Sequence, residues 1–549
     1  MITQNRTYSR VFYFLIAIIL AIGIFFRFTN LSNKIYWIDE VHTTLRVAGY
    51  EKVEFAETAP SGKIIGINEL HNFQRLNPER GWGDTMNALA HNAEHTPIYY
   101  LLTRLAMQWF GSSTAVTRGV AAGISLLVFP SIYWLCLELF RSPIVGAIAM
   151  SLVAVSPLHI LYAQEARQYS LFTVTILISS IALLKALPRQ EESSSQKKNW
   201  GNWGIYAATV SFNLYSHLIS LLVVLGHGIY ILILHGRKQF FKYLIALGLG
   251  LMSLTPWIVL YFLNSNKIGG WIARDISLGT LVQRWFINLT TVFFDLHVIY
   301  KQRIFDVETG QDMALNSGNV SRSLMLLIFI FVGYCLYFLC RHRPKPVWLF
   351  VLTLMGTTGL ALMLPDIISG GQRSGIARYL IPCYLGIQLA VADAIAHHIT
   401  PNITPNKNRP VISVNPLQQK LWQGIFISLI TLGIISSSMS MEAETWWHKY
   451  SSYYNPEVAQ IINQTDRPLV ISSQKRVSRI TSLSYKLNPE VKILLIKNRQ
   501  IPAIDGAFKN LFVFRPSAEL YQAFEENPNY QLIPAHPFGH LFKLQRLNG

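Results

Sequence analysis

Two adjacent carboxylates, Asp39 and Glu40, directly follow a long apolar run near the start of the chain. Carboxylates are common general bases, so a pair beside a membrane-length run suggests chemistry at a membrane surface. The simpler alternative is that both side chains are solvated loop acids. The pair alone does not decide between the two interpretations.

A third carboxylate, Glu165, lies with Arg167 and Tyr162 in a short polar stretch that joins two further apolar runs. A turn this short pins both charged side chains at the membrane surface, where ionisable groups are costly and tend to mark functional sites. In the topology derived below, this turn faces the same side as Asp39 and Glu40. The shared side favours a functional site over scattered surface charges.

Glu94 and His95 come just before an apolar stretch that contains Tyr99, and His217 lies in a later short turn. A helix start explains the local pattern around residues 95–97, and a lone histidine in a turn is more often an ordinary polar residue. Oxygen and imidazole ligands such as Glu94 and His217 could also hold a divalent cation. The sequence leaves the metal, and any other cofactor, open.

Arg373, Arg378 and Tyr379 lie in a late loop that the topology places outside. Arginines usually remain on the cytoplasmic side of a membrane protein. These two are either anchors whose charged ends reach the lipid headgroups or ligands of a phosphate group. The second function suits them because a guanidinium fork matches phosphate oxygens.

The composition explains why these residues lie at a membrane. Of the 549 residues, 51% are apolar and 14% are charged, whereas soluble domains carry about 25% charged residues. Runs of roughly 20 apolar residues recur, and each can cross a bilayer. We predict a mostly α, polytopic transmembrane helical bundle of about eleven spans, near residues 11–28, 116–140, 144–161, 169–187, 203–219, 220–235, 243–263, 323–340, 346–364, 376–397 and 421–440.

The net charge of +18 comes largely from short basic linkers between these runs. Basic linkers remain in the cytoplasm, which favours a membrane role over nucleic-acid binding. An N-terminus inside and eleven crossings place the C-terminus outside. We therefore expect a multi-pass protein of the cell inner (plasma) membrane with a cytoplasmic N-terminus. The linkers predicted to be inside lie near residues 141–143, 185–198, 237–242, 341–345 and 407–420.

Two domains are predicted: a transmembrane domain over residues 1–440, with outer loops 29–114 and 264–322, and a soluble domain over residues 441–549. In the first outer loop, residues 95–110 are apolar but short and contain Arg104, so they predict an amphipathic helix at the interface. Short apolar segments alternate with helix-like stretches after residue 441, which predicts a small extracytoplasmic α/β domain with a partly parallel sheet. The segments are 468–472, 491–496 and 510–514, and the helical stretches are 456–464 and 516–525.

The order of these motifs resembles the GT-C class of polyprenyl-phosphate-dependent glycosyltransferases, in the branch of protein O-mannosyltransferases and lipid A aminoarabinose transferases. The matching pieces are the Asp-Glu pair, an acidic residue before a Pro-x-Tyr-Tyr helix, a Tyr-x-Gln-Glu-Ala-Arg-x-Tyr turn, a Tyr-x-His turn and a late Arg-Tyr-x-x-Pro. The resemblance covers about residues 8–400 and leaves out residues 441–549. Relatives often have His-Pro-Pro where this chain has His95-Thr-Pro.

The resemblance implies transfer of a sugar from a polyprenyl-phosphate carrier to an acceptor hydroxyl on the extracytoplasmic face. Asp39 would be the general base, the anomeric centre would invert, and arginines would stabilise the leaving phosphate. The implied catalytic residues are Asp39, Glu40 and Glu165; the implied donor-phosphate ligands are Arg167, Arg373 and Arg378; the implied cavity residues are Glu94, His95, Tyr99, Tyr162, His217 and Tyr379.

The expected partners are the lipid-linked sugar donor, membrane lipid, and an acceptor that is a lipid, a polysaccharide or a protein. A membrane transporter or lipid flippase is the alternative function. Transporters place ionisable groups near the middle of the bilayer and often contain repeats. This chain gathers its acids at one surface and shows no internal repeat, which favours the transferase.

Overall fold

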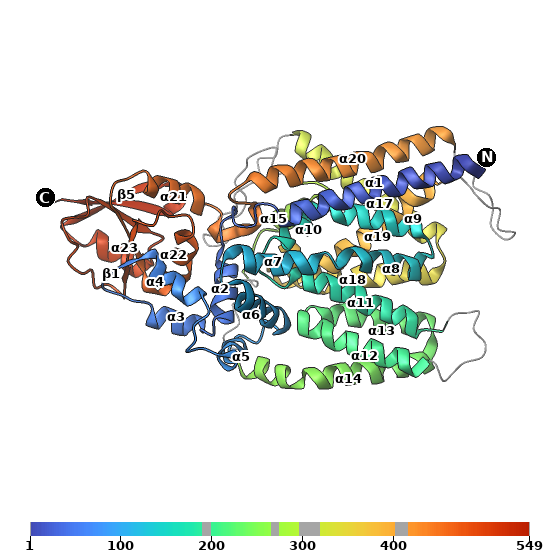
Figure 1. Ribbon diagram of the computed structural model, residues 1–549, viewed down its shortest axis with the longest axis horizontal. Helices are drawn as coiled ribbons and strands as arrows, with labels where there is room; N and C mark the ends of the chain where they lie inside the picture. Colours follow the sequence, from blue (N-terminus) through green and yellow to red (C-terminus); the bar gives the residue numbers. More distant parts are fainter. Residues whose placement is uncertain (1, 189–198, 265–273, 296–318, 401–414, 548–549) are drawn as a thin grey trace.

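The computed structural model describes residues 2–188, 199–264, 274–295, 319–400 and 415–547. A bundle of long helices carries a smaller, sheet-containing part at one end (Figure 1). The N-terminus lies at the opposite end of the bundle (Figure 1). Residues 265–273 and 296–318 of the predicted outer loop 264–322 lie outside the described residues.

Within the described residues, eight helical segments are long and apolar enough to cross a membrane. Each coincides with a predicted span, because a run of apolar residues can satisfy its own backbone hydrogen bonds only as a helix in lipid. The segments are built from α1 (Ile2–Phe28), α7 with α8 (Thr114–Ser125, Val128–Phe140), α11 (Tyr169–Ala186), α14 (Gly236–Leu263), α17 (Asn319–His342), α18 (Lys345–Ser369), α19 (Ile381–Ile399) and α20 (Pro416–Glu442).

The remaining three predicted spans are less regular. The predicted span 144–161 is a pair of helices, α9 (Pro143–Ala154) and α10 (Pro157–Ala163), bent by 61° and countable as a ninth span. The spans 203–219 and 220–235 correspond to α12 (Asn199–Ser216) and α13 (Ser220–Leu234), which lie between α11 and α14 (Figure 1). Neither helix is both long and apolar enough to count as a full span, so eight or nine of the eleven predicted spans are found in the described part of the chain.

The bend between α9 and α10 has a local cause. Pro157 cannot donate a backbone hydrogen bond and disfavours helical geometry in the residue before it. The carbonyls freed at the end of α9 still need partners inside the bundle. Arg27 supplies them, because its Nη1 donates to the Ala154 oxygen at 2.6 Å and its Nη2 to the Val153 oxygen at 3.1 Å.

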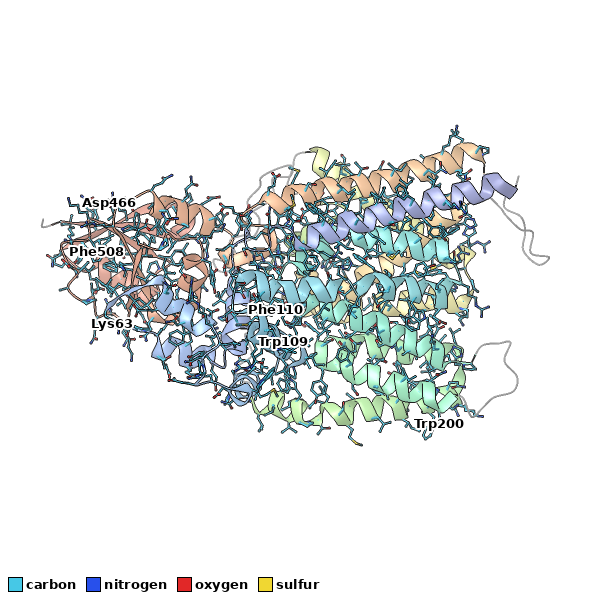
Figure 2. The ribbon with its side chains drawn as sticks, in the orientation of Figure 1. Lys63, Trp109, Phe110, Trp200, Asp466 and Phe508 are labelled. Carbon is cyan, nitrogen blue, oxygen red and sulfur yellow. The ribbon has the colours of Figure 1, made fainter. Side chains whose placement is uncertain are left out.

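Short helices connect the bundle to the sheet. They are α2 (Ile38–Val47), α3 (Lys52–Thr58), α4 (Ile67–His71), α5 (Trp82–Ala90) and α6 (Ile98–Phe110). Helix α6 is the predicted interfacial helix; its 13 residues span about 20 Å, too little for a bilayer core. Trp109 and Phe110 at its end are 70% and 72% exposed, and Trp200 is exposed at the opposite end of the bundle (Figure 2). Exposed aromatic side chains at two levels are typical of the two membrane interfaces.

The C-terminal part contains a six-stranded sheet in the order β1-β3-β2-β4-β6-β5. Strand β2 pairs in parallel with β3 and β4, and the other pairs are antiparallel. The predicted segments are confirmed as β2 (Pro468–Ser473), β3 (Lys492–Ile496), β4 (Asn510–Phe514), α21 (Asn455–Asn463) and α23 (Ala518–Glu525). The sequence missed β1 (Ile64–Gly66), α22 (Val477–Ser484), β5 (Tyr530–His536) and β6 (Leu541–Arg546).

Strand β1 belongs to residues 29–114, the first loop predicted to be outside, so this loop and the C-terminal part share one sheet. The remaining elements are α15 (Leu278–Thr290) and the 3-10 helices Asn72–Gln74, Arg373–Gly375, Ala377–Leu380, Trp447–Ser452, Gln474–Arg476 and Pro537–Gly539.

Candidate active site

Asp39 and Glu40 lie in the first turn of α2, where the positive end of the helix dipole favours negative side chains. Successive helical residues point in different directions, so the two carboxylates meet different surroundings. The Asp39 side chain is 24% exposed, whereas Glu40 is completely buried. Only Asp39 of this pair is open to a substrate.

Asp39 faces two arginines from distant parts of the chain. Its Oδ2 lies 3.8 Å from Nη2 of Arg167 and 3.6 Å from Nη2 of Arg378. Nη1 of Arg167 also donates to the Thr43 hydroxyl at 3.2 Å and to the Tyr100 hydroxyl at 3.3 Å. The structure therefore brings together three of the residues singled out in the sequence, Asp39, Arg167 and Arg378. Two guanidinium groups against one carboxylate leave a positive charge that suits an anionic ligand.

Aromatic rings surround Arg378. Its guanidinium carbon lies 5.6 Å from the ring centre of Trp37, 5.8 Å from Tyr169 and 5.5 Å from Tyr379. These distances allow cation–π attraction. The predicted cavity residue Tyr379 thus lies at the site, whereas Tyr99 is buried in the hydrophobic core behind it.

Sequence reasoning missed Arg46, which lies two turns along α2 from Asp39 and so on the same side of the helix. Its Nη2 donates to Asn92 Oδ1 at 3.2 Å, and its charge acts on Glu94 and Arg167. The seven-residue spacing between Asp39 and Arg46 was a signal in the sequence that could have found it.

Glu40 and Glu165 form a buried ion cluster beside the Asp39 site. Arg118 holds Glu40 with two bonds of 2.7 Å, from Nε to Oε1 and from Nη2 to Oε2. Lys449 lies between the two carboxylates, with its Nζ 3.4 Å from Glu40 and 2.9 Å from Glu165. His448 lies 2.8 Å from Glu165. None of the four charged side chains is more than 1% exposed.

The positive charges in this cluster favour the ionised form of both carboxyl groups. Burial opposes the ionisation of Glu40, but Arg118 and Lys449 outweigh it and lower the pKa of its carboxyl group. Glu165 shows the same balance, in which burial is outweighed by Lys449 and His448 and its pKa is lowered. Neither carboxylate can reach a substrate without breaking these contacts, so the geometry favours a role in positioning the site for both.

Glu94 and His95 lie at the end of the loop before α6. His95 Nε2 is 3.4 Å from Glu94 Oε1. Burial, together with the positive charges of Arg46 and Arg167, lowers the pKa of His95 well below its usual value. Burial raises the pKa of Glu94. Both effects favour the neutral form of each side chain.

His217 stacks on Phe172 with ring centres 4.7 Å apart, and its Nδ1 accepts a hydrogen bond from the Ile219 amide at 3.2 Å. Burial and the charges of Arg167 and Arg378 lower the pKa of His217 to about 3. Among the described residues, no group of three or more His, Cys, Asp or Glu side chains could hold a metal ion. Glu94 and His217 are therefore not members of such a group in the described part of the chain.

Arg373 is paired with a different carboxylate, Asp366. Its Nη1 donates to Asp366 Oδ1 at 2.9 Å and to the Gly370 oxygen at 3.1 Å. Asp366 also accepts hydrogen bonds from the amide and the hydroxyl of Ser374. These contacts fasten the end of α18 to the following loop, while the predicted phosphate role of Arg373 stays a prediction.

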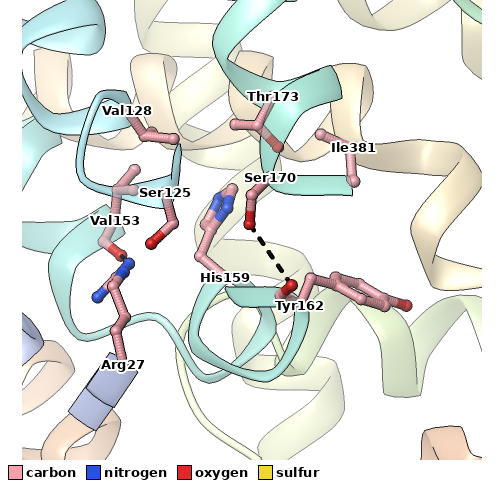
Figure 3. A pocket seen from close by; sticks show the side chains of 9 residues that line it. All are labelled: Arg27, Ser125, Val128, Val153, His159, Tyr162, Ser170, Thr173 and Ile381. Carbon is pink, nitrogen blue, oxygen red and sulfur yellow. Dashed lines mark hydrogen bonds between the residues drawn. The ribbon is translucent and has the colours of Figure 1, made fainter. Parts of the chain in front are cut away.

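Behind the site, the bend between α9 and α10 encloses a cavity of about 10 Å³, which has room for one water molecule. Arg27, Ser125, His159 and Ser170 point toward it, and the Tyr162 ring points away (Figure 3). His159 Nε2 lies 3.0 Å from Gln388 Oε1. The cavity lies next to the turn that carries Glu165 and Arg167, since Tyr162 and Ser170 flank that turn, and it is too small for a sugar.

Together, the apolar helices and the charged end of the bundle define a multi-pass membrane protein with a polar site at one end. No protein-family model matches the chain. No curated protein matches it in sequence.

Among solved structures, the chain is similar to ArnT from Cupriavidus metallidurans bound to undecaprenyl phosphate. The TM-score is 0.49 and the identity 12%, over 96% of this chain and 97% of that one. It is also similar to the archaeal oligosaccharyltransferase AglB from Archaeoglobus fulgidus, in complex with an inhibitory peptide and a dolichol-phosphate. Here the TM-score is 0.45 and the identity 12%, over 88% of this chain and 65% of that one.

Proposed function

We propose that this chain is an integral-membrane glycosyltransferase that transfers a sugar from a polyprenyl-phosphate carrier to an acceptor hydroxyl on the extracytoplasmic face. The observation that carries the proposal is the partly exposed carboxylate of Asp39 between Arg167 and Arg378. A base for the acceptor and two cations for a leaving phosphate are the groups that such a transfer needs.

In this mechanism the acceptor hydroxyl gives its proton to Asp39 while its oxygen attacks the anomeric carbon of the sugar. The bond between that carbon and the phosphate oxygen breaks, and its electron pair leaves with the phosphate. A single displacement of this kind inverts the anomeric centre. The polyprenyl phosphate gains negative charge, which Arg167 and Arg378 stabilise.

Before the donor binds, the same two arginines face Asp39. A donor phosphate competes for their N–H groups and draws them away from the carboxylate. The Asp39 carboxylate is then free to accept a hydrogen bond from the acceptor hydroxyl. Glu40 and Glu165 act through position, because Ala166 next to Glu165 donates its amide to Glu40 Oε1 at 2.9 Å and so ties the arginine-bearing turn to α2.

The test uses the full chain in lipid nanodiscs, supplied with radiolabelled polyprenyl-phosphate sugars and a crude envelope fraction as acceptor. We expect the parent protein to consume one donor and Asp39→Asn to bind it without turnover. Asp466→Asn, in an exposed loop of the sheet-containing part (Figure 2), is the matched control and should behave as the parent. Equal turnover by Asp39→Asn removes Asp39 as the base. A parent that neither binds nor consumes any donor rejects the transferase and makes transport the function to test.

A further inference from the structure

Residues 446–452, here called the connecting segment, join the last span to the sheet-containing part and pass directly beside the Asp39 site. At its start, Trp446 and Trp447 both donate from Nε1 to Asp295 Oδ2, at 2.7 and 2.8 Å. In its middle, Lys449 enters the buried cluster of Glu40 and Glu165. The segment is therefore anchored to the membrane bundle at two points.

The end of the connecting segment is held by the sheet-containing part. The Arg515 guanidinium donates to the Ser451 oxygen. The Ser452 hydroxyl oxygen accepts a hydrogen bond from Ser482 at 3.0 Å and another from the Ile38 amide, one residue before Asp39, at 3.2 Å. The segment thus links the sheet-containing part to the start of α2.

Between these anchors, Tyr450 has an unusual backbone conformation, with φ 40° and ψ −116°. A non-glycine residue with positive φ is strained, and such strain persists only where the surroundings impose it, often at functional sites. Here the two neighbours of Tyr450 impose it, because Lys449 is fixed by buried carboxylates and Ser451 by Arg515.

This conformation directs the Tyr450 ring to Arg378, whose guanidinium carbon lies 5.5 Å from the ring centre. The ring also lies 6.0 Å from that of Trp37. Tyr450 thus adds a fourth aromatic ring, from a fourth part of the chain, around Arg378. Rings on several sides restrict the rotamers of the arginine and exclude water, while its Nη2 remains directed at Asp39, 3.6 Å away.

We infer that Tyr450 is a positioning residue that holds Arg378 ready for the donor phosphate, and that the sheet-containing part acts on the membrane site through the connecting segment. This inference rests on the proposed function. A ring that only filled space would contribute to stability and not to recognition of the phosphate.

The test compares the binding of undecaprenyl phosphate and of undecaprenol, which has the same chain without the phosphate, to the full protein in nanodiscs. Tyr450→Gly removes the ring and also relieves the positive φ, so folding should not suffer. We expect it to bind undecaprenyl phosphate about tenfold more weakly, as for the loss of one desolvated cation–π contact, with undecaprenol binding unchanged. Tyr450→Phe should retain parental binding.

Two further variants serve as controls. Tyr453→Ala removes a ring from the residue just after the connecting segment, where φ is −54°, and should leave both lipids bound as in the parent. Tyr450→Leu keeps apolar volume without a π system and should weaken phosphate binding as glycine does. The inference is overturned if Tyr450→Gly and Tyr450→Leu bind undecaprenyl phosphate as tightly as the parent, or if they lose affinity for both lipids equally. Either result leaves the proposed function standing. A parent protein that binds no undecaprenyl phosphate overturns the proposed function as well.

Discussion

Asp39 and Glu40 are neighbours in the sequence but belong to two different electrostatic regions. The region around Asp39 is partly open, and its guanidinium groups outnumber its carboxylate. The region around Glu40 and Glu165 is closed, and the charges of Arg118 and Lys449 balance the two carboxylates. Unbalanced charge at an accessible site can bind a charged ligand. Balanced charge in a closed site can only fix the relative positions of the elements that carry it. The two side chains leave α2 from adjacent positions in its first turn but point in different directions, which separates the two regions.

The comparison predicts its largest effect at Asp39. In Asp39→Asn the shape remains but the base is gone, so kcat should fall by about 10²–10⁴-fold, the usual contribution of a general base. The apparent melting temperature should stay near that of the parent, because the side chain is partly exposed. Single-turnover transfer of labelled sugar and thermal unfolding in nanodiscs measure the two quantities. A large fall in the melting temperature of Asp39→Asn would mean that Asp39 stabilises the fold, as the closed region around Glu40 does.

The second largest effect is expected in the closed region, and on stability. Arg118→Met leaves the Glu40 carboxylate buried without its bidentate partner. Breaking a buried pair in this way costs about 3–5 kcal/mol of unfolding free energy. The double variant Arg118→Met with Glu40→Leu removes both charges and should recover most of the loss. If the single variant unfolds like the parent, the cluster does not stabilise the junction between α2 and the bundle.

A smaller effect, on the KM for the donor, should distinguish Arg378 from Arg373, which the sequence analysis assigned to the same phosphate site. Arg378→Lys loses the guanidinium fork beside Asp39 and should raise the KM for the donor by about tenfold. Arg373→Lys should change this KM little, because Arg373 is already paired with Asp366. The two variants change the same chemical group, so donor titrations compare them directly. Equal increases in KM would return Arg373 to the phosphate site that the sequence predicted.

The sequence predicted the spans and much of the open region because these signals are local. Each apolar run forms its own helix, and Asp39, Arg167 and Arg378 are each conspicuous as charges at a membrane surface. The closed region depends on contacts between distant residues: Lys449 lies 284 positions from Glu165 and 409 from Glu40. Nothing in the local pattern of residues 446–452 indicated this, and three-residue β1 was too short to predict. Arg118, by contrast, lay within a predicted span and could have been recognised as a buried charge.

The smallest effect concerns pH and the protonation state of Lys34. If Lys34 is neutral in the folded protein, Arg118 and Lys449 alone balance the two carboxylates of the closed region. The Lys34 side chain is buried beside the cluster and donates to Gln164 Oε1 at 3.2 Å. Burial, with repulsion from Lys449 and Arg118, lowers the pKa of its ammonium from 10.5 to about 7. A lysine whose pKa is lower in the folded state opposes folding at low pH, since the unfolded chain binds the proton more tightly. Its contribution to stability should therefore rise with pH from about 7 to about 10.5.

Lys34→Met removes this titration, so the variant should gain stability over the parent at pH 6 and lose that advantage as the pH approaches 10. The lowered pKa values of Glu40 and Glu165 act in the opposite range: their contribution is complete above the usual carboxyl pKa of 4.5 and is lost below it as the pH falls through their folded values. Thermal unfolding of both proteins between pH 5 and 10 separates the two effects. A parallel pH profile for parent and Lys34→Met would mean that Lys34 remains protonated and that the closed region carries an additional positive charge.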